Sequence, residues 1–255
     1  MKLPISLVIV TLNEEKNIGR CLKSAPWADE ILVLDSGSQD RTTEIAQNLG
    51  ARVFSEPWRG YGPQKHRAAE LAKNDWVFAI DADEEISADL SAEIVKKFSQ
   101  LNSSTAYRIP RKSFYLGRWI LHGGWYPDFQ TRLFHRRFHQ WNDQVIHEKV
   151  EAKSQENFSF SILHYVFRDV SQHVITNNRY SELQAQQHLA NGGKFSWFKF
   201  LTKPMSKFLE CYFLKLGFLD GFAGYFIAVS AAYSVFIRWA KIKQFSDEKG
   251  SHLYD

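Results

Sequence analysis

The chain has 255 residues, of which 44% are hydrophobic and 15% aromatic, enough for one large domain or a domain with an appendage. Its formal net charge of +4 excludes binding of a polyanion through overall charge, and we expect no nucleic acid partner. Two cysteines without a CxxC pair argue against a disulfide framework or a zinc site and favour a reducing compartment.

The first hundred residues alternate short apolar runs rich in β-forming residues with segments of helical spacing. We predict strands at 5–10, 31–34, 52–56, 76–80 and 105–109, and helices at 14–24, 40–49, 64–73 and 87–99. The first run is too short for a signal peptide, and acids follow it at once. The alternation predicts an α/β fold with a mixed, mainly parallel sheet and helices on both faces.

Polar segments follow three of the predicted strands. They read "TLNEE" at 11–15, "DSGSQD" at 35–40 and "DADEE" at 81–85. The carboxyl ends of parallel strands meet at one edge of a sheet, and ligands bind outside that edge. We therefore expect the three segments to form a single site.

The segment Asp81-Ala82-Asp83 carries the most specific chemistry. In an extended chain, residues i and i+2 point the same way, so both carboxylates can face one divalent cation. Mg²⁺ or Mn²⁺ takes one or two carboxylates together with substrate phosphates, and neutralises a diphosphate leaving group. The alternative is a solvated loop with helix-capping acids, a role that we assign to Glu84 and Glu85.

Two further segments suit a nucleotide. Asp35 and Ser36 lie in a predicted tight turn, where a carboxylate can accept hydrogen bonds from ribose hydroxyls or a base N–H. Lys65 follows the glycine-rich stretch "GYGP" and can meet a diphosphate, although the stretch is not a dinucleotide fingerprint. The alternatives are a simple turn before a helix capped by Asp40, and a surface helix around Lys65.

Residues 110–150 are dense in aromatic, arginine and histidine residues, and we predict mixed strands with a long loop. A sugar site needs aromatic faces, arginines or acids for hydroxyls, and one carboxylate to take a proton from the attacking hydroxyl. The segments "GWYPDFQTRLFHRR" and "VIHEKV" supply these groups, with Asp128, Arg132, His147 and Glu148 as the candidates. We expect structural or surface roles for four further histidines, at 122, 135, 139 and 164.

The C-terminal segment, 196–255, is aromatic, basic and helical in pattern. Between Lys194 and Lys243 there are eight lysines and arginines but two acids, and the 17 residues 221–237 carry no charge. That run is slightly short of the ~20 residues that a spanning helix needs. Interleaved aromatic and basic residues favour helices at the interface of an anionic membrane. A buried helical pair and a spanning helix remain as alternatives.

At these residues the sequence resembles the family 2 glycosyltransferases, which have the GT-A fold. "SLVIVTLNEEKNIGRCL", "ILVLDSGSQDRTTEIA" and "WVFAIDADEEIS" match three blocks of that family in order and spacing. The second half, with "GGWYPDFQTRLF", "VIHEKV" and "GFLDGFAGYFIAVSAAY", resembles the bacterial branch that builds the lipopolysaccharide inner core. A typical member of that branch is a β-1,4-glucosyltransferase that acts on heptose.

The resemblance implies an inverting transfer from a nucleotide sugar, with UDP-glucose as the expected donor. Asp83 would hold Mg²⁺ or Mn²⁺ on the diphosphate, with Asp81 assisting as a ligand or near the ribose. Glu148 would act as general base, with Asp128 as the competing candidate. The donor-binding residues implied together with Asp81 are Thr11, Asn13, Glu14, Asp35, Ser36 and Lys65.

The resemblance also implies a domain plan and a location. Residues 1–195 would form the GT-A catalytic domain, with a nucleotide-sugar-binding half at 1–109 and an acceptor-binding half at 110–195. Residues 196–255 would hold the enzyme on the cytoplasmic face of the inner membrane, where a lipid-linked saccharide is the acceptor. A polyprenyl-phosphate glycosyltransferase and a nucleotidyltransferase are the rival functions.

Overall fold

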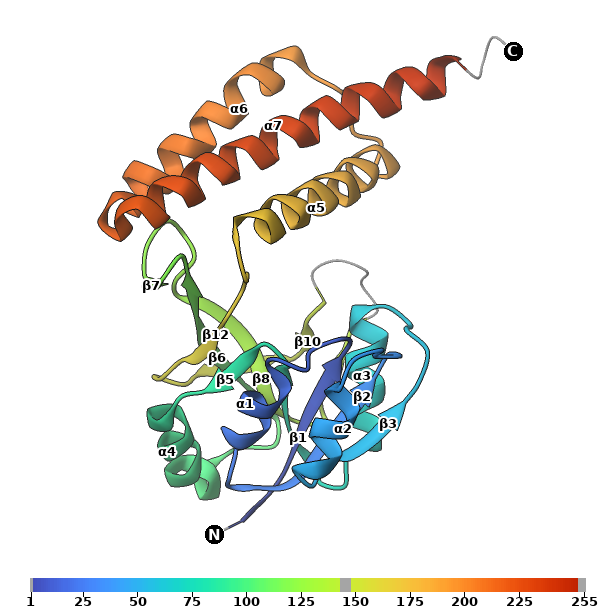
Figure 1. Ribbon diagram of the computed structural model, residues 1–255, viewed down its shortest axis with the longest axis vertical. Coiled ribbons are helices and arrows are strands. Elements are labelled where there is room, and N and C mark those ends of the chain that lie inside the picture. Colours follow the sequence, from blue (N-terminus) through green and yellow to red (C-terminus); the bar gives the residue numbers. More distant parts are fainter. Residues whose placement is uncertain (1, 143–147, 252–255) are drawn as a thin grey trace. The chain divides into compact units, whose positions relative to one another are not determined.

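The computed structural model describes residues 2–142 and 148–251 (Figure 1). The chain forms two compact units. Unit 1 consists of Met1–Lys112 and Pro127–Tyr165, and unit 2 of Ser113–Tyr126 and Val166–Asp255. Unit 1 ends at Tyr165, whereas the predicted catalytic domain extends to residue 195. The two differ because helix α5 (Val170–Ala190) packs with the C-terminal helix and so belongs to unit 2.

Unit 1 is built on a parallel four-stranded core. Its strands are β1 (Leu3–Thr11), β2 (Ala28–Asp35), β3 (Arg52–Ser55) and β4 (Trp76–Asp81), in the order β3-β2-β1-β4. The connecting helices are α1 (Ile18–Lys23), α2 (Thr42–Asn48) and α3 (Tyr61–Leu71), and α4 (Ala88–Lys97) follows β4. Ser87 caps α4 by accepting a hydrogen bond from the amide of Leu90, as its sequence position predicts.

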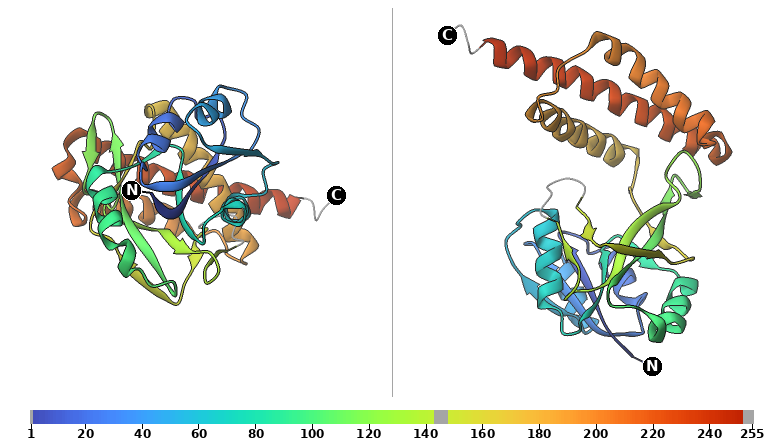
Figure 2. Two further views of the ribbon diagram at one scale, coloured as in Figure 1. Left: turned by 90° about the horizontal axis from the view of Figure 1, so that it is seen from below. Right: turned by 180° about the vertical axis from the view of Figure 1, so that it is seen from behind.

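Both faces of this core are covered, which confirms the predicted fold class. Leu7 and Ile9 of β1 pack on one face with residues of α1, α2 and α4. Val8 of the same strand points to the opposite face and packs with Ala68 and Ala69 of α3. Figure 2 shows α3 on the face opposite to the one that α1 and α2 cover in Figure 1. Successive side chains of a strand point to opposite faces of the sheet. Because both faces are covered here, each of these strands is a continuous apolar run in the sequence.

An antiparallel part extends the sheet beyond β4. There β8 (Asp128–His135) pairs antiparallel with β4 and with β6 (Thr105–Tyr115), and β12 (Ile162–His164) pairs antiparallel with β5 (Glu84–Ile86). Two short strands pair with β6: β7 (Arg118–Ile120) antiparallel and β11 (Ser154–Asn157) parallel. A separate two-stranded antiparallel sheet consists of β9 (Gln140–Trp141) and β10 (Val150–Glu151). The sheet is therefore mixed, as predicted.

The prediction of a helix from residue 14 is wrong at its start, because α1 begins at Ile18. Asn13 has a left-handed backbone with a φ of 56°, and its side-chain oxygen accepts a hydrogen bond from the amide of Gln39. Asp40 accepts hydrogen bonds from the amides of Glu15 and Thr42. These bonds hold residues 12–17 in a turn against the next loop, and the helix starts after it.

Unit 2 contains three long helices and a small hairpin. The helices are α5, α6 (Trp197–Leu209) and α7 (Gly221–Ser251), and the hairpin joins the end of β6 to β7. A π-helical turn, η2 (Glu210–Leu214), and a 3₁₀ turn, η3 (Gly217–Asp220), connect α6 to α7. The helix Gly217–Glu248 is long and apolar enough to cross a membrane by length and composition, and about a third of its most apolar window is buried.

Candidate active site

The three polar segments predicted to share one edge do follow strands that end side by side. Thr11 at the end of β1 pairs with Asp35 at the end of β2, and Val10 pairs with Asp81 at the end of β4. The carboxyl ends of these parallel strands therefore present residues 11–15, 35–40 and 81–85 at one edge of unit 1. This is the position where open α/β sheets bind ligands.

Asp35 is buried, and its carboxylate organises the turn that follows β2. One oxygen accepts hydrogen bonds from the amides of Gly37 and Ser38, each at 2.9 Å, and the other accepts from the Ser38 hydroxyl. Gly37 has a φ of 103°, which a residue with a side chain rarely adopts. The structure thus supports the turn-forming role of Asp35, and Ser36 accepts a hydrogen bond from Gln64.

The end of β1 holds one buried polar atom without a partner among the described residues. The hydroxyl oxygen of Thr11 makes no hydrogen bond within the part of the chain that the structure describes. Glu14 accepts a hydrogen bond from Asn17 at 2.8 Å, and burial raises the pKa of the Glu14 carboxyl. A buried hydroxyl needs a partner, so Thr11 is suited to contact a ligand at this edge.

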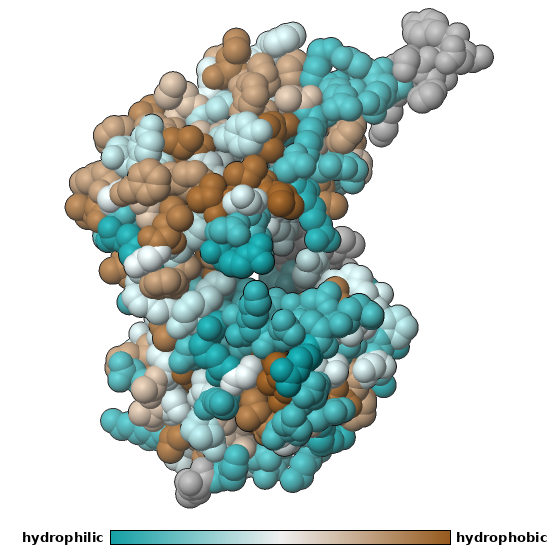
Figure 3. Space-filling view, viewed as in Figure 1, coloured by the Kyte–Doolittle hydropathy of each residue, from teal (hydrophilic) through white to brown (hydrophobic). Residues whose placement is uncertain are grey.

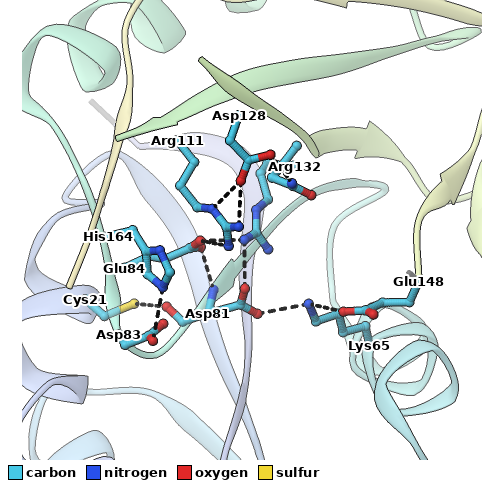
Figure 4. Close-up of polar contacts among 11 residues, drawn as sticks. Cys21, Lys65, Asp81, Asp83, Glu84, Arg111, Asp128, Arg132, Glu148 and His164 are labelled. Atoms are coloured by element: carbon cyan, nitrogen blue, oxygen red, sulfur yellow. Dashed lines mark hydrogen bonds and ion pairs between the residues drawn. The ribbon is translucent and has the colours of Figure 1, made fainter. Parts of the chain in front are cut away.

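Asp81 is held between two cations (Figure 4). One carboxylate oxygen lies 2.7 Å from the guanidinium of Arg132, and the other lies 3.0 Å from the Lys65 ammonium. Burial acts to raise the pKa of Asp81, but the charges of Arg132 and Lys65 outweigh it and hold that pKa well below its ordinary value of 3.8. Asp81 is therefore ionised, and both of its oxygens are engaged.

The ion pairs around Asp81 continue in both directions. Arg132 is almost fully buried and also contacts Glu84, at 2.6 Å. Glu84 is completely buried, so the predicted solvated role of this residue is wrong. Arg111, which the sequence did not single out, lies 3.3 Å from Glu84 and 2.6 Å from Asp128, and so links the two acids. The result is a chain of alternating charges, which we call the ion-pair chain: Glu148, Lys65, Asp81, Arg132, Glu84, Arg111 and Asp128.

Asp81 and Asp83 do not share a face in the way that the sequence argument assumed. Strand β4 ends at Asp81, and residues 82–83 form a turn before β5. The Asp83 carboxylate lies instead 3.3 Å from Nε2 of His164. His164, which the sequence analysis assigned to a structural or surface role, is brought there because β12 pairs antiparallel with β5.

Asp83 and His164 are the residues that fit a divalent cation. Carboxylate oxygen and imidazole nitrogen are both metal ligands, and the two side chains approach each other beside the carboxyl edge of the sheet. Within residues 2–142 and 148–251, no group of three or more histidine, cysteine or acidic side chains is placed to hold a metal. A cation here would complete its coordination with substrate phosphates and water, as Mg²⁺ and Mn²⁺ do in phosphate-transferring sites.

The two candidate bases lie at opposite ends of the ion-pair chain. Both oxygens of Asp128 are engaged, one by two nitrogens of Arg111 at 2.6 and 2.9 Å and the other by Gln130 at 2.7 Å. Glu148 accepts a hydrogen bond from Lys65 at 3.0 Å through one oxygen. His147, the neighbour of Glu148 in the predicted motif, lies outside the described residues.

A cavity of about 430 Å³ in unit 1 lies away from the ion-pair chain, between α3 and residues 134–141. At Lys65, Asp81 and Arg132 the free space is about 10 Å³, which is room for a single water molecule. Lys65, Asp81 and Arg132 are therefore closely packed at this point.

Comparisons with known proteins find a matching family model and similar proteins. A model of glycosyl transferase family 2 matches residues 6–154. An uncharacterized glycosyltransferase of Rickettsia typhi is 34% identical over 95% of this chain and 87% of the relative. The lipopolysaccharide core biosynthesis glycosyltransferase LpsC of Rhizobium meliloti is 30% identical, and the match covers 95% of this chain and 93% of LpsC.

One solved structure with a partial match is glucosyl-3-phosphoglycerate synthase from Mycobacterium tuberculosis, in complex with Mn²⁺, uridine diphosphate and glucosyl-3-phosphoglycerate. It is 32% identical in sequence, and the match covers 44% of each chain with a TM-score of 0.35.

Replacing Arg132 by methionine should strongly destabilise unit 1. The Arg132→Met change leaves buried Glu84 and Asp81 short of a cation, which costs about 3–5 kcal/mol of unfolding free energy. Arg137→Met is the control, because Arg137 is exposed in its pair with Asp75 and should cost at most about 1 kcal/mol. Urea denaturation at neutral pH measures both values, and equal losses would contradict the structural role of Arg132.

The same variant should alter the dependence of stability on pH. Because the pKa of Asp81 is depressed, its contribution is present above the ordinary value of 3.8 and is lost as the pH falls through the depressed pKa. The wild type should therefore lose this contribution below about pH 4. The Arg132→Met variant should lose less unfolding free energy than the wild type over that pH range. Urea denaturation at successive pH values measures the difference.

Proposed function

Since the chain belongs to glycosyl transferase family 2, we propose that it transfers glucose from UDP-glucose to a heptose of the lipopolysaccharide inner core. Family membership makes it a glycosyltransferase; the sugar, the nucleotide and the acceptor are proposals. One observation carries the proposal most directly. Asp83 with His164, and Asp81 with Lys65, lie at the carboxyl edge of a parallel sheet, where a nucleotide diphosphate can meet both a metal site and a cation.

In this proposal Asp83 and His164 hold Mg²⁺ or Mn²⁺. The bound cation would neutralise the charge that develops on the diphosphate as it leaves. Asp81 is less suited as a ligand than the sequence suggested, because Arg132 and Lys65 occupy both of its oxygens. Its role is to fix Lys65 at the edge of the sheet, from where the ammonium can reach a phosphate.

The nucleoside is proposed to lie over the ends of β1 and β2. Thr11 offers a buried hydroxyl without a partner in the described residues, and Asp35 fixes a turn whose backbone a ligand can approach. Asn13 and Glu14 form the neighbouring turn, and Ser36 lies directly beyond β2.

Glu148 is the better candidate for the general base. The proton must reach a carboxylate oxygen from the acceptor hydroxyl, and both oxygens of Asp128 are engaged by Arg111 and Gln130, whereas Lys65 engages one oxygen of Glu148. Glu148 is joined to the donor-facing edge through Lys65, which also contacts Asp81. When Lys65 moves to the donor phosphate, Glu148 becomes available at the same edge.

The reaction is then a single in-line displacement with inversion. Glu148 accepts the proton of the acceptor hydroxyl as its oxygen attacks the anomeric carbon. The bond between that carbon and the diphosphate oxygen breaks, and the nucleoside diphosphate leaves with the bonding electrons. Lys65 stabilises the charge of the leaving group, and Asp83 and His164 would hold the cation that supplies the remaining counter-charge.

The acceptor is proposed from the relative LpsC and from the surface of unit 2. LpsC is named as a lipopolysaccharide core enzyme, and its similarity extends over 95% of this chain. Lipopolysaccharide precursors are lipid-linked, so the enzyme must work at a membrane, here the cytoplasmic face of the inner membrane. A polyprenyl phosphate is the rival acceptor; a nucleotidyltransferase is disfavoured by the family match.

A donor screen tests the proposed function. We expect slow hydrolysis of UDP-glucose without an acceptor, faster than that of other nucleotide sugars, and dependent on Mg²⁺ or Mn²⁺. EDTA should abolish turnover because the leaving diphosphate then lacks its counter-charge. If another nucleotide sugar were hydrolysed faster, it would replace UDP-glucose as the proposed donor. Full activity in EDTA would contradict the proposed metal site.

The metal assignment predicts a preference for Mn²⁺ that depends on His164. An imidazole ligand favours Mn²⁺ over Mg²⁺, so His164→Ala should weaken Mn²⁺ binding in the presence of UDP by at least about tenfold. Electron paramagnetic resonance of free Mn²⁺ measures binding without turnover. His66→Ala is the control, since that half-exposed histidine pairs with Glu70 on α3. Equal affinities of the two variants would exclude His164 as a ligand.

The base assignment predicts unequal effects of two isosteric variants. Glu148→Gln should bind donor normally but transfer at least about 10²-fold more slowly, because the amide cannot take the proton. Asp128→Asn should retain transfer within about tenfold, since Asp128 pairs with Arg111 rather than with the reacting hydroxyl. Single-turnover transfer rates distinguish the variants, and the reverse order would give the role to Asp128.

A further inference from the structure

The connection between α6 and α7 exposes an unusual number of large apolar side chains. We call it the apolar turn; Leu214 is 80% exposed and Phe222 is 72% exposed. The outer face of α6 continues this surface with Trp197, Phe198 and Leu201, and Figure 3 shows hydrophobic residues gathered over α6 and α7. The side chains of the apolar turn are Phe213, Leu214, Leu216, Phe218, Leu219 and Phe222.

We infer that the apolar turn enters the hydrocarbon of one membrane leaflet, with the outer face of α6 along the interface and α7 not spanning. The inference deepens the proposed function, because it rests on a lipid-linked acceptor for its biological sense. The binding that it predicts can nevertheless be measured without any catalysis.

The backbone of the apolar turn is suited to an apolar surrounding. In hydrocarbon, each backbone N–H and C=O must find a partner within the protein. The amide of Lys215 donates to the carbonyl of Glu210, and the carbonyl of Lys215 accepts from the amide of Gly123, both at 2.8 Å. The amide of Leu219 donates to the carbonyl of Leu216 at 3.0 Å. The turn therefore presents paired backbone groups beneath its apolar side chains.

The connection contains two acids: Glu210 pairs with Lys207 and Lys215, and Asp220 is withdrawn from the surface. Asp220 is 1% exposed, and it accepts hydrogen bonds from the amides of Leu121 and His122 at 3.1 and 2.8 Å. The guanidinium of Arg118 lies 3.5 Å from it. Its charge is thus satisfied inside unit 2, which removes the electrostatic penalty that an exposed carboxylate would impose on insertion.

The turn is also built as a rigid protrusion. A Cβ atom on Gly224 would lie 1.8 Å from the carbonyl oxygen of Gly217, so only glycine permits this approach. A Cβ on Gly217 would lie 2.6 Å from the carbonyl oxygen of Cys211. Leu216 has a left-handed φ of 56°, which turns the chain sharply between the two short helices. A fixed apolar protrusion loses little conformational entropy on insertion.

Basic residues accompany the apolar surface, which favours a lipid partner over a protein one. Lys199 and Lys203 are exposed along α6, and Lys207 and Lys215 pair with Glu210 at the beginning of the turn. Cations beside an inserted apolar segment lie at the depth of anionic headgroups. We therefore commit to an anionic bilayer as the occupant, and treat a second copy of the chain as an outcome of the test.

Polar contacts along α7 argue against a spanning helix. Ser230 of α7 accepts a hydrogen bond from Asn177 of α5 at 2.8 Å. Further along, Arg238 donates to Gln184 and Lys241 donates to Asn178, at 3.2 and 2.9 Å. If α7 crossed the bilayer, these contacts would draw the polar helix α5 into hydrocarbon, where polar groups are costly.

The experiment uses the full chain and vesicles of phosphatidylethanolamine with or without phosphatidylglycerol. Wild type should float with the anionic vesicles, and Leu214→Asp should bind at least about tenfold more weakly. Ile175→Asp is the matched control, because Ile175 on α5 is 69% exposed and lies outside the apolar turn. It should bind within about twofold of the wild type. Absence of wild-type binding, or equal losses in both variants, would overturn the inference.

Two further measurements separate the alternatives. An environment-sensitive dye on Leu214→Cys should shift to shorter wavelength on vesicles, whereas a dye on Ile175→Cys should not. Protection of the C-terminus from protease outside sealed vesicles would show spanning, and a wild-type dimer that Leu214→Asp dissociates without lipid would show a second copy; either overturns the inference. UDP-glucose hydrolysis retained by Leu214→Asp separates a failed insertion from a failed donor assignment.

Discussion

The ion pair between Asp81 and the buried Arg132 is the interaction on which the candidate site depends. A cluster of acids at the end of a buried strand is unstable without a counter-charge, because burial favours the neutral carboxyl and like charges repel. Arg132 supplies that charge from β8, the strand that pairs antiparallel with β4. The antiparallel extension of the sheet is therefore what makes an acidic edge on the parallel core possible.

The ion-pair chain also assigns different tasks to acids that are neighbours in sequence. Asp81 and Glu84 are engaged with Arg132 and hold the edge of the sheet together. Asp83 turns away from them to His164, so a carboxylate and an imidazole come together at a second position. A metal placed at Asp83 would not compete with Arg132 for the same oxygens. A single turn at residues 82–83 thus separates the carboxylates that pair with Arg132 from the one that contacts His164.

Sequence patterns predicted the parallel core and its polar edge because both are local properties of the chain. Each strand of the core is a short apolar run, and each polar segment follows its strand directly. Arg111 and His164 were not recognised, since their neighbours in space come from the pairing of β6 with β8 and of β12 with β5. The turn at 82–83 was also missed, because an Asp-Ala-Asp segment has no glycine or proline to mark it.

Unit 2 shows why an apolar helix cannot be assigned to a core or to a membrane from its composition. On α7, Ala223, Ile227 and Trp239 are buried, whereas Phe222 and Tyr233 on the same helix are exposed. Packing separates the two sets: Ala223 and Ile227 are buried with Tyr115 and Ile120, and Trp239 is buried with Ala185 of α5. On the flank of α7 that faces α5, Ser230, Arg238 and Lys241 make polar contacts. Phe222 at the beginning of the helix stays exposed. The same helix therefore combines a polar flank with an exposed apolar end, a division that the uncharged run at 221–237 conceals.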